Sequence, residues 1–123
     1  MTINEAITRV DNLKYNTFTR AEKIAWLNKI EWMLKLNIID THMGGEDIEF
    51  NGYTQTSHPD TVLIAPPPFD ELYLRWLEAQ IDLHNGENEL YNTSIVMFNS
   101  EYEQYENWYN RTYLPKKLGR FLF

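Results

Sequence analysis

Residues 64–87 read IAPPPFDELYLRWLEAQIDLHNGE, and this stretch decides the fold. Each of the three prolines biases the residue before it away from the helical region, so we expect an extended approach to the next element. Apolar and aromatic residues then recur three and four positions apart, which indicates one continuous helix face. Asn85-Gly86 is typical of a helix C-terminus. The pattern predicts a sharply bounded helix over 69–85, and Leu74 and Leu83, which lie off its main face, suggest that more than one side is covered.

Three further helices are predicted around it. Thr2 is a candidate N-cap for a helix over 3–13, and Thr19 with Glu22 forms a capping box for a helix over 20–38. A fourth helix, over 87–113, restarts almost at once after Gly86 and ends before Pro115, so it should form a hairpin with the third. The residues that we expect in the core are Trp76, Leu77, Ile81, Leu27, Leu34 and Phe98.

The segment 40–68 has a different character. Gly44-Gly45, Asn51-Gly52 and Pro59 are turn-forming residues, while Ile48, Phe50 and the run 61–65 are typical of short β-strands. The predicted fold class is therefore mainly α: a compact four-helix domain with a small β-hairpin excursion between the second and third helices.

Composition limits the classes of function. The 123 residues fit one domain, with no cysteine for disulfides or thiolate chemistry. Residues 1–110 hold seven Lys and Arg against all 18 Asp and Glu, a net charge of −11, whereas 111–123 hold four Lys and Arg and no acid. An acidic body repels phosphate, which disfavours sequence-specific nucleic-acid binding. We expect neither a signal peptide nor a membrane span.

Residues that could carry chemistry do not converge in the sequence. His42, His58 and His84 lie in different predicted elements without metal-ligand spacing. The serine, histidine and aspartate of SHPD at 57–60 are neighbours along the chain and cannot form a triad, so a solvated turn is favoured. The glutamates of the fourth helix are read as a solvated face. We expect no enzyme activity, no cofactor and no metal.

Aromatic residues, with one isoleucine, form a stripe along the fourth helix at three- and four-residue spacing. Two interpretations stay open: core packing, or a subunit interface in which tyrosines supply contact area with a polar tip. The stripe consists of Tyr91, Ile95, Phe98, Tyr102, Tyr105, Tyr109 and Tyr113.

A series of short motifs runs along much of the chain: FNGYT at 50–54, PPPFDELY at 66–73, EAQID at 78–82, the Asn85-Gly86 break, MFN at 97–99 and YNR at 109–111. Through these motifs, roughly residues 20–115 resemble a group of small prophage proteins from Gram-positive bacteria. Those proteins are similar to head–tail connectors, or neck adaptors, of tailed phages. The resemblance implies a mainly helical protein without a catalytic motif.

The resemblance also implies a function and partners. The protein is expected to assemble as a homo-oligomeric ring at the portal vertex and to contact the portal protein and a tail-proximal neck protein. Its expected location is the virion neck, and the bacterial host cytoplasm before assembly. The alternative is an acidic DNA mimic or regulatory prophage protein that inhibits a host nucleic-acid-binding enzyme; the interspersed lysines and the basic C-terminal segment disfavour it.

The final residues are the predicted partner-binding segment. We divide the chain into a helical domain over 1–113 and a basic, aromatic tail over 114–123, because apolar anchors at a terminus, together with a charge opposite to that of the body, favour docking. Docking onto a partner and folding back onto the chain's own helices both stay open. The predicted contact residues are Lys116, Lys117, Leu118, Arg120, Phe121, Leu122 and Phe123.

Overall fold

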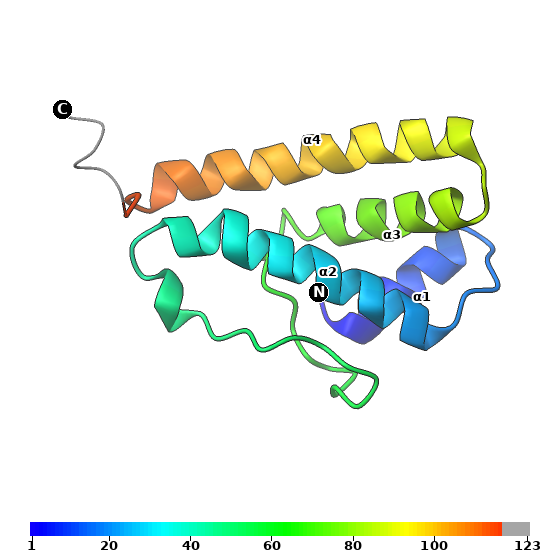
Figure 1. Ribbon diagram of the computed structural model, residues 1–123, viewed down its shortest axis with the longest axis horizontal. Helices are drawn as coiled ribbons and strands as arrows, with labels where there is room; N and C mark the ends of the chain where they lie inside the picture. Colours follow the sequence, from blue (N-terminus) through cyan, green and yellow to red (C-terminus); the bar gives the residue numbers. More distant parts are fainter. Residues whose placement is uncertain (117–123) are drawn as a thin grey trace.

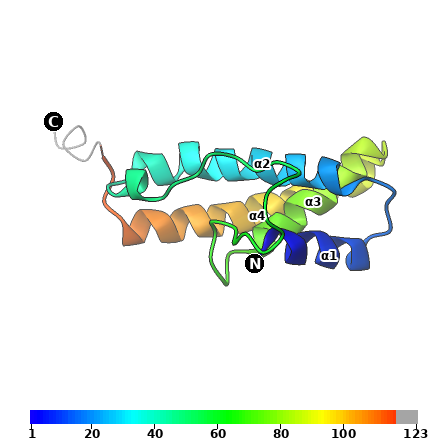
Figure 2. The same ribbon diagram turned by 90° about the horizontal axis from the view of Figure 1, so that it is seen from below.

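The computed structural model describes residues 1–116 and contains four α-helices. They are α1 (Ile3–Leu13), α2 (Arg20–Asn37), α3 (Glu71–His84) and α4 (Asn88–Thr112), with short 3-10 helices η1 (Ile39–Thr41) and η2 (Gly45–Asp47) after α2. In Figure 1, α4 lies along one edge of the molecule, with α3 beneath it. In Figure 2, α1 and α2 lie on opposite sides of α3. The mainly helical, four-helix prediction is confirmed.

The helix boundaries follow from the capping residues. The Thr2 side chain accepts a hydrogen bond from Glu5 N, and Thr19 forms the predicted capping box with Glu22. At the end of α3, Gly86 has a φ of 73°, its N–H donates to Leu83 O, and Glu87 N donates to Asp82 O. These two bonds form a Schellman motif, which satisfies carbonyls at the helix end and turns the chain into α4.

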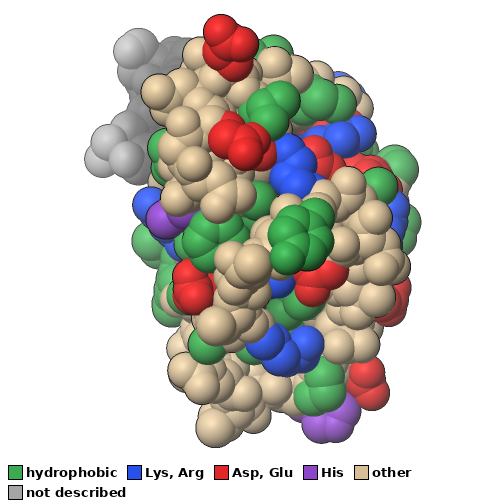
Figure 3. All heavy atoms as spheres, turned by 90° about the vertical axis from the view of Figure 1, so that its right-hand side faces the viewer, with side chains coloured by type: hydrophobic (Ala, Val, Ile, Leu, Met, Phe, Trp, Pro, Cys, Tyr) green, Lys and Arg blue, Asp and Glu red, His purple; other side chains and the backbone are tan. Residues whose placement is uncertain are grey.

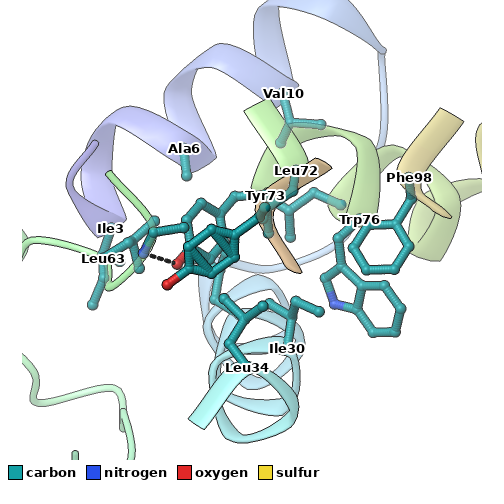
Figure 4. Packing of buried hydrophobic residues seen from close by; sticks show 14 of the residues in the cluster. Ile3, Ala6, Val10, Ile30, Leu34, Leu63, Leu72, Tyr73, Trp76 and Phe98 are labelled. Atoms are coloured by element: carbon teal, nitrogen blue, oxygen red, sulfur yellow. Dashed lines mark hydrogen bonds between the residues drawn. The ribbon is translucent and has the colours of Figure 1, made fainter. Parts of the chain in front are cut away.

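Helix α3 is the centre of the core. Leu72, Leu77 and Ile81 are buried on its predicted face, and Leu74 is buried on another side, so α3 is covered by more than one neighbour. In Figure 4, Tyr73 lies between α1 and the α2 residues Ile30 and Leu34, while the Trp76 ring lies beside Phe98 of α4. All six predicted core residues are buried.

The predicted β-hairpin is wrong for the part of the chain that the structure describes. The two β-prone pieces do not pair with each other; Val62 instead forms an isolated antiparallel bridge with Thr2, and His42 forms one with Pro115. Leu63 N donates to Met1 O, and Ile3 N donates to Thr61 O. The carbonyl of Thr61 and the N–H of Leu63 are thus bonded to the start of the chain. The segment around Ile48 and Phe50 follows α2 without strand pairing.

The three prolines lead into α3 through a turn. Phe69 N donates to Pro66 O over 2.8 Å, so the chain turns over 67–70 instead of staying extended, and α3 begins at Glu71. Within residues 1–116, no helix is long and apolar enough to cross a membrane.

We predict that Trp76→Ala destabilises the protein by about 3–5 kcal/mol, because the ring is buried and a cavity would remain. The indole N–H also donates to Trp26 O over 2.8 Å, which joins α3 to α2. Urea unfolding measures this cost, and Leu36→Ala, at an exposed position of α2, is the control with an expected change below about 0.5 kcal/mol. A loss well under about 1 kcal/mol for Trp76→Ala would contradict this packing.

Candidate partner-binding surface

The end of α4 returns to the loop that follows α2. Met43 N donates to Leu114 O over 2.7 Å, and Lys116 N donates to Thr41 O over 2.9 Å. These bonds flank the bridge between His42 and Pro115. Residues 114–116 are therefore fixed to the 41–43 loop by backbone hydrogen bonds on both sides of Pro115.

The buried His42 packs where residues 114–116 contact the 41–43 loop. Its Nδ1 lies 2.6 Å from Ile38 O, and its ring packs edge-on against Tyr109 with centroids 4.8 Å apart. Neither His58 nor His84 lies with it: His58 Nδ1 accepts from Asp60 N within the SHPD turn, and His84 Nδ1 contacts Gln80 O. Over residues 1–116 no group of three or more His, Asp or Glu side chains could hold a metal ion.

The Gly44-Gly45 pair positions the same loop. Gly44 has a φ of 84°, and a Cβ on Gly45 would lie 2.3 Å from Ile39 O, so a side chain there would collide with η1. The buried Lys35 donates to Gly45 O over 2.7 Å and to Asp40 over 2.6 Å. The loop is therefore held tightly at the C-terminal end of α2.

Lys116 is the one predicted contact residue that lies within the described residues. Its Nζ is 3.3 Å from Glu46, on the same chain. The pKa of the exposed Glu46 carboxyl is lowered, mainly by a hydrogen bond from the backbone of Glu46 itself. The side-chain hydrogen bond from Lys116 and the positive charge of Lys116 lower it further. The other predicted contact residues lie outside the described residues, and binding of a partner by this segment stays a prediction: they are Lys117, Leu118, Arg120, Phe121, Leu122 and Phe123.

Apolar side chains remain exposed around this exit point. Met43 is 57% exposed and Leu114 is 64% exposed, and Tyr113 beside them is also exposed. By contrast, Figure 3 shows the opposite end of the molecule with Lys, Arg, Asp and Glu side chains interspersed among small hydrophobic patches. We call Met43, Tyr113 and Leu114, with Lys116, the exit patch; it is the candidate surface that the described residues offer beside the predicted tail.

The tyrosine stripe of α4 is mostly core. Phe98, Tyr105 and Tyr109 are buried within the chain, while Tyr91 and Tyr102 are half-buried and Tyr113 is exposed. Burial raises the pKa of Tyr105 above its ordinary value, and the electrostatic interaction with the neighbouring Tyr109 raises it further. The stripe thus packs mainly within the chain, and its last residue belongs to the exit patch.

Sequence reasoning missed a buried polar cluster centred on Glu31. The fully buried carboxylate accepts hydrogen bonds from Tyr73 Oη, from Tyr53 Oη over 2.6 Å and from Ile64 N over 2.9 Å. Tyr73 Oη also accepts from Ala65 N over 2.8 Å. Glu31 lies among the apolar positions of α2 and belongs to no sequence motif. The only feature of the sequence that could have indicated the cluster is a charged residue on a helix face that is expected to be buried.

The Glu31 cluster joins the long loop to the helices. Asn28, one turn before Glu31, accepts from Tyr53 N over 2.8 Å, and Gly52 has a φ of 96° that lets the chain pass close to Asn28. A second buried carboxylate, Asp82, is bound by Lys14 and Ser94, each over 2.6 Å. Through residue 116, every buried side-chain nitrogen and oxygen has a hydrogen-bond partner.

Comparisons with models of known families, with curated proteins and with solved structures find no match to this chain. In the structure, the motifs of the connector resemblance between residues 66 and 111 lie in the turn before α3, in α3, in its C-terminal turn and in two short segments of α4. Many of these residues are buried, including Leu72, Tyr73 and Ile81. The sequence likeness therefore lies in the α3–α4 hairpin and, through FNGYT at 50–54, in the long loop, and not in the exit patch.

We predict that Tyr73→Phe destabilises the protein by about 1–3 kcal/mol, because it leaves the buried Ala65 N–H without a partner and takes one donor from Glu31. Tyr53→Phe is the matched control. Tyr53→Phe removes one donor from a Glu31 oxygen that still accepts a hydrogen bond from Ile64 N. The Tyr53 ring is only half-buried, so this substitution should lower the free energy of unfolding by less than Tyr73→Phe does. Chemical denaturation of both variants that gave equal losses, or a larger loss for Tyr53→Phe, would contradict this ranking.

The Glu31 cluster also predicts a pH dependence. Burial raises the pKa of the Glu31 carboxyl above its ordinary value of 4.5, against the opposing hydrogen bonds from Tyr53, Tyr73 and Ile64. The folded state then holds this proton more tightly, so its contribution to the free energy of unfolding falls as pH rises above 4.5. Glu31→Gln lacks this contribution. Denaturation of the parent and the variant at a series of pH values should therefore show that the free energy of unfolding of the parent, minus that of the variant, falls as pH rises above 4.5. A difference that stays flat or rises would refute the prediction.

Proposed function

We propose that the protein is a structural head–tail connector, or head-completion protein, of a tailed phage or prophage. On this proposal it assembles as a ring at the portal vertex, contacts the portal protein and a tail-proximal neck protein, and resides in the virion neck. It has no catalytic activity of its own. The resemblance over residues 20–115 suggests the family, and the exposed residues near Lys116 support a contact between copies.

The single observation that supports the proposal is the attachment of residues 114–116 to the 41–43 loop. The backbone bonds of Leu114 and Lys116 hold Lys116, the residue before the basic, aromatic segment of the sequence, at the loop that carries the exposed Met43. An apolar patch next to a basic, aromatic segment is suited to a protein partner. A segment attached to a fixed Lys116 loses less conformational entropy when it binds a partner than one attached to a mobile residue would.

Ring assembly requires two different surfaces on each copy. A ring is built from head-to-tail contacts, in which one surface binds a different surface of the next copy. The exit patch and the basic segment supply the first surface. The body, with a net charge of −11 over residues 1–110, supplies an acidic second surface. The same acidic charge favours passage of DNA through a ring without tight binding to phosphate.

The buried carboxylates support a structural role. Both Glu31 and Asp82 are saturated by donors from the chain itself, and these bonds connect α2, α3, α4 and the long loop. A carboxylate used for proton transfer must reach a substrate atom within hydrogen-bonding distance. These two instead hold the elements of the fold together.

The test is removal of residues 117–123, which keeps Leu114–Lys116 in place on the loop. We expect the free energy of unfolding to change by less than about 0.5 kcal/mol, because the described contacts are retained. We expect loss of ring formation, measured by mass photometry and electron microscopy with the portal protein of the same prophage. A chain with Gly and Ser at these seven positions controls for length. Normal assembly of either variant, or unfolding of the truncated chain, would contradict the proposal.

A further inference from the structure

A second exposed surface lies on the outer side of α4, away from its packed face. Its residues recur three and four positions apart from the start of the helix to its end, so they form one strip along the helix. All of them are exposed, including Leu90 at 50% and Met97 at 40%. We call this set the outer strip: Leu90, Thr93, Met97, Ser100, Gln104, Asn107 and Arg111.

The outer strip differs from an ordinary solvated helix face in charge. Residues 90–100 contain no charged side chain, in a chain of which 24% is charged. Val96, which borders the strip between Thr93 and Ser100, is 65% exposed. Two glutamates flank the strip, Glu101 on one side and Glu103 on the other. An uncharged, partly apolar strip along a solvent-facing helix favours a helix as its partner.

The two ends of the strip carry opposite charges. Glu89 lies beside Leu90 at the N-terminal end, and Arg111 lies at the C-terminal end. Neither makes an ion pair with any residue up to 116. A second helix laid antiparallel would bring Glu89 of each copy to Arg111 of the other, whereas a parallel helix would bring like charges together.

We propose that the outer strip binds the outer strip of a second copy of this chain, with the two α4 helices antiparallel about a two-fold axis at Ser100. Ser100 is midway between Glu89 and Arg111 and has the smallest side chain of the strip, so the two backbones can approach closely at the axis. Thr93 then faces Asn107 of the other copy, and Val96 faces Gln104. The methylenes of Arg111 cover Leu90 of the second copy.

The fold leaves this face open to a second copy. In Figure 1, α4 forms one edge of the molecule, with α3 on its inner side and no other described helix beyond it. The exit patch lies past the end of α4 and is not needed for the contact. The antiparallel arrangement also brings the N-terminus of each helix near the C-terminus of the other, which the helix dipoles favour.

The helix pair is distinct from the ring contact of the proposed function. A two-fold contact closes after two copies and cannot by itself extend a ring, which needs head-to-tail contacts. The pair therefore joins copies two at a time, before ring assembly or across two rings. It uses α4 and not residues 117–123, so the failure of one proposal leaves the other standing.

Site-specific disulfide formation tests the axis, because the chain has no native cysteine. We expect Ser100→Cys in the full-length protein to form a covalent dimer under mild oxidation, since the two thiols would meet at the axis. Asn99→Cys is the matched control: it is exposed on the same helix but lies about 100° around it, away from the axis. Equal yields from the two variants, or no dimer from Ser100→Cys, would overturn the proposal.

Sedimentation equilibrium tests the direction of the pair. Arg111→Glu should weaken the dimer roughly ten-fold, because it places two acids at each end of the pair. Adding Glu89→Arg should restore it, since both ion pairs return with their signs exchanged. Val96→Glu should also weaken the dimer, whereas Leu36→Glu, on α2, should not. A parent protein that stays monomeric across the concentration series, or a double variant no better than Arg111→Glu, would refute the antiparallel pair.

Discussion

The buried carboxylate of Glu31 is the interaction on which the arrangement of the chain depends. A charge without water is costly unless donors surround it, and here two tyrosine hydroxyls and one backbone N–H point at its two oxygens. Those donors come from the long loop and from α3, while Glu31 belongs to α2. The need to satisfy one charge therefore fixes the path of a loop that has little regular structure of its own.

This constraint explains how α3 can be covered on several sides. Helices α1 and α2 contribute their apolar faces, and α4 covers a further side through Phe98 and Tyr105. Residues 61–65, held by Glu31 and by the first residues of the chain, bring Leu63 and Ala65 into the same core. The loop is thus part of the hydrophobic core, which accounts for its ordered path between turn residues.

The outer strip and the exit patch consist of residues that the core does not bury. Helix α4 packs through its aromatic stripe and leaves on its far side the outer strip, whose residues from Leu90 to Asn107 are uncharged. The residues that follow α4, Leu114 to Lys116, are held at the 41–46 loop by backbone bonds and by the Lys116–Glu46 ion pair. The exit patch suits head-to-tail assembly because it joins apolar and basic groups on an acidic chain. The outer strip suits a symmetric contact because its two ends are complementary to each other.

The sequence by itself determined the helices, because their signals are local. Thr2, Thr19 with Glu22, and Asn85-Gly86 each act within one or two turns, and the apolar spacing within α2, α3 and α4 identified the core residues. Only the tertiary structure decided the rest. The β-prone run 61–65 pairs with Thr2 and Met1 instead of its neighbour in sequence, because strand pairing is chosen by whichever backbone groups the fold brings close. The Glu31 cluster depends in the same way on which elements the fold brings together, and such long-range contacts leave no fixed spacing in the sequence.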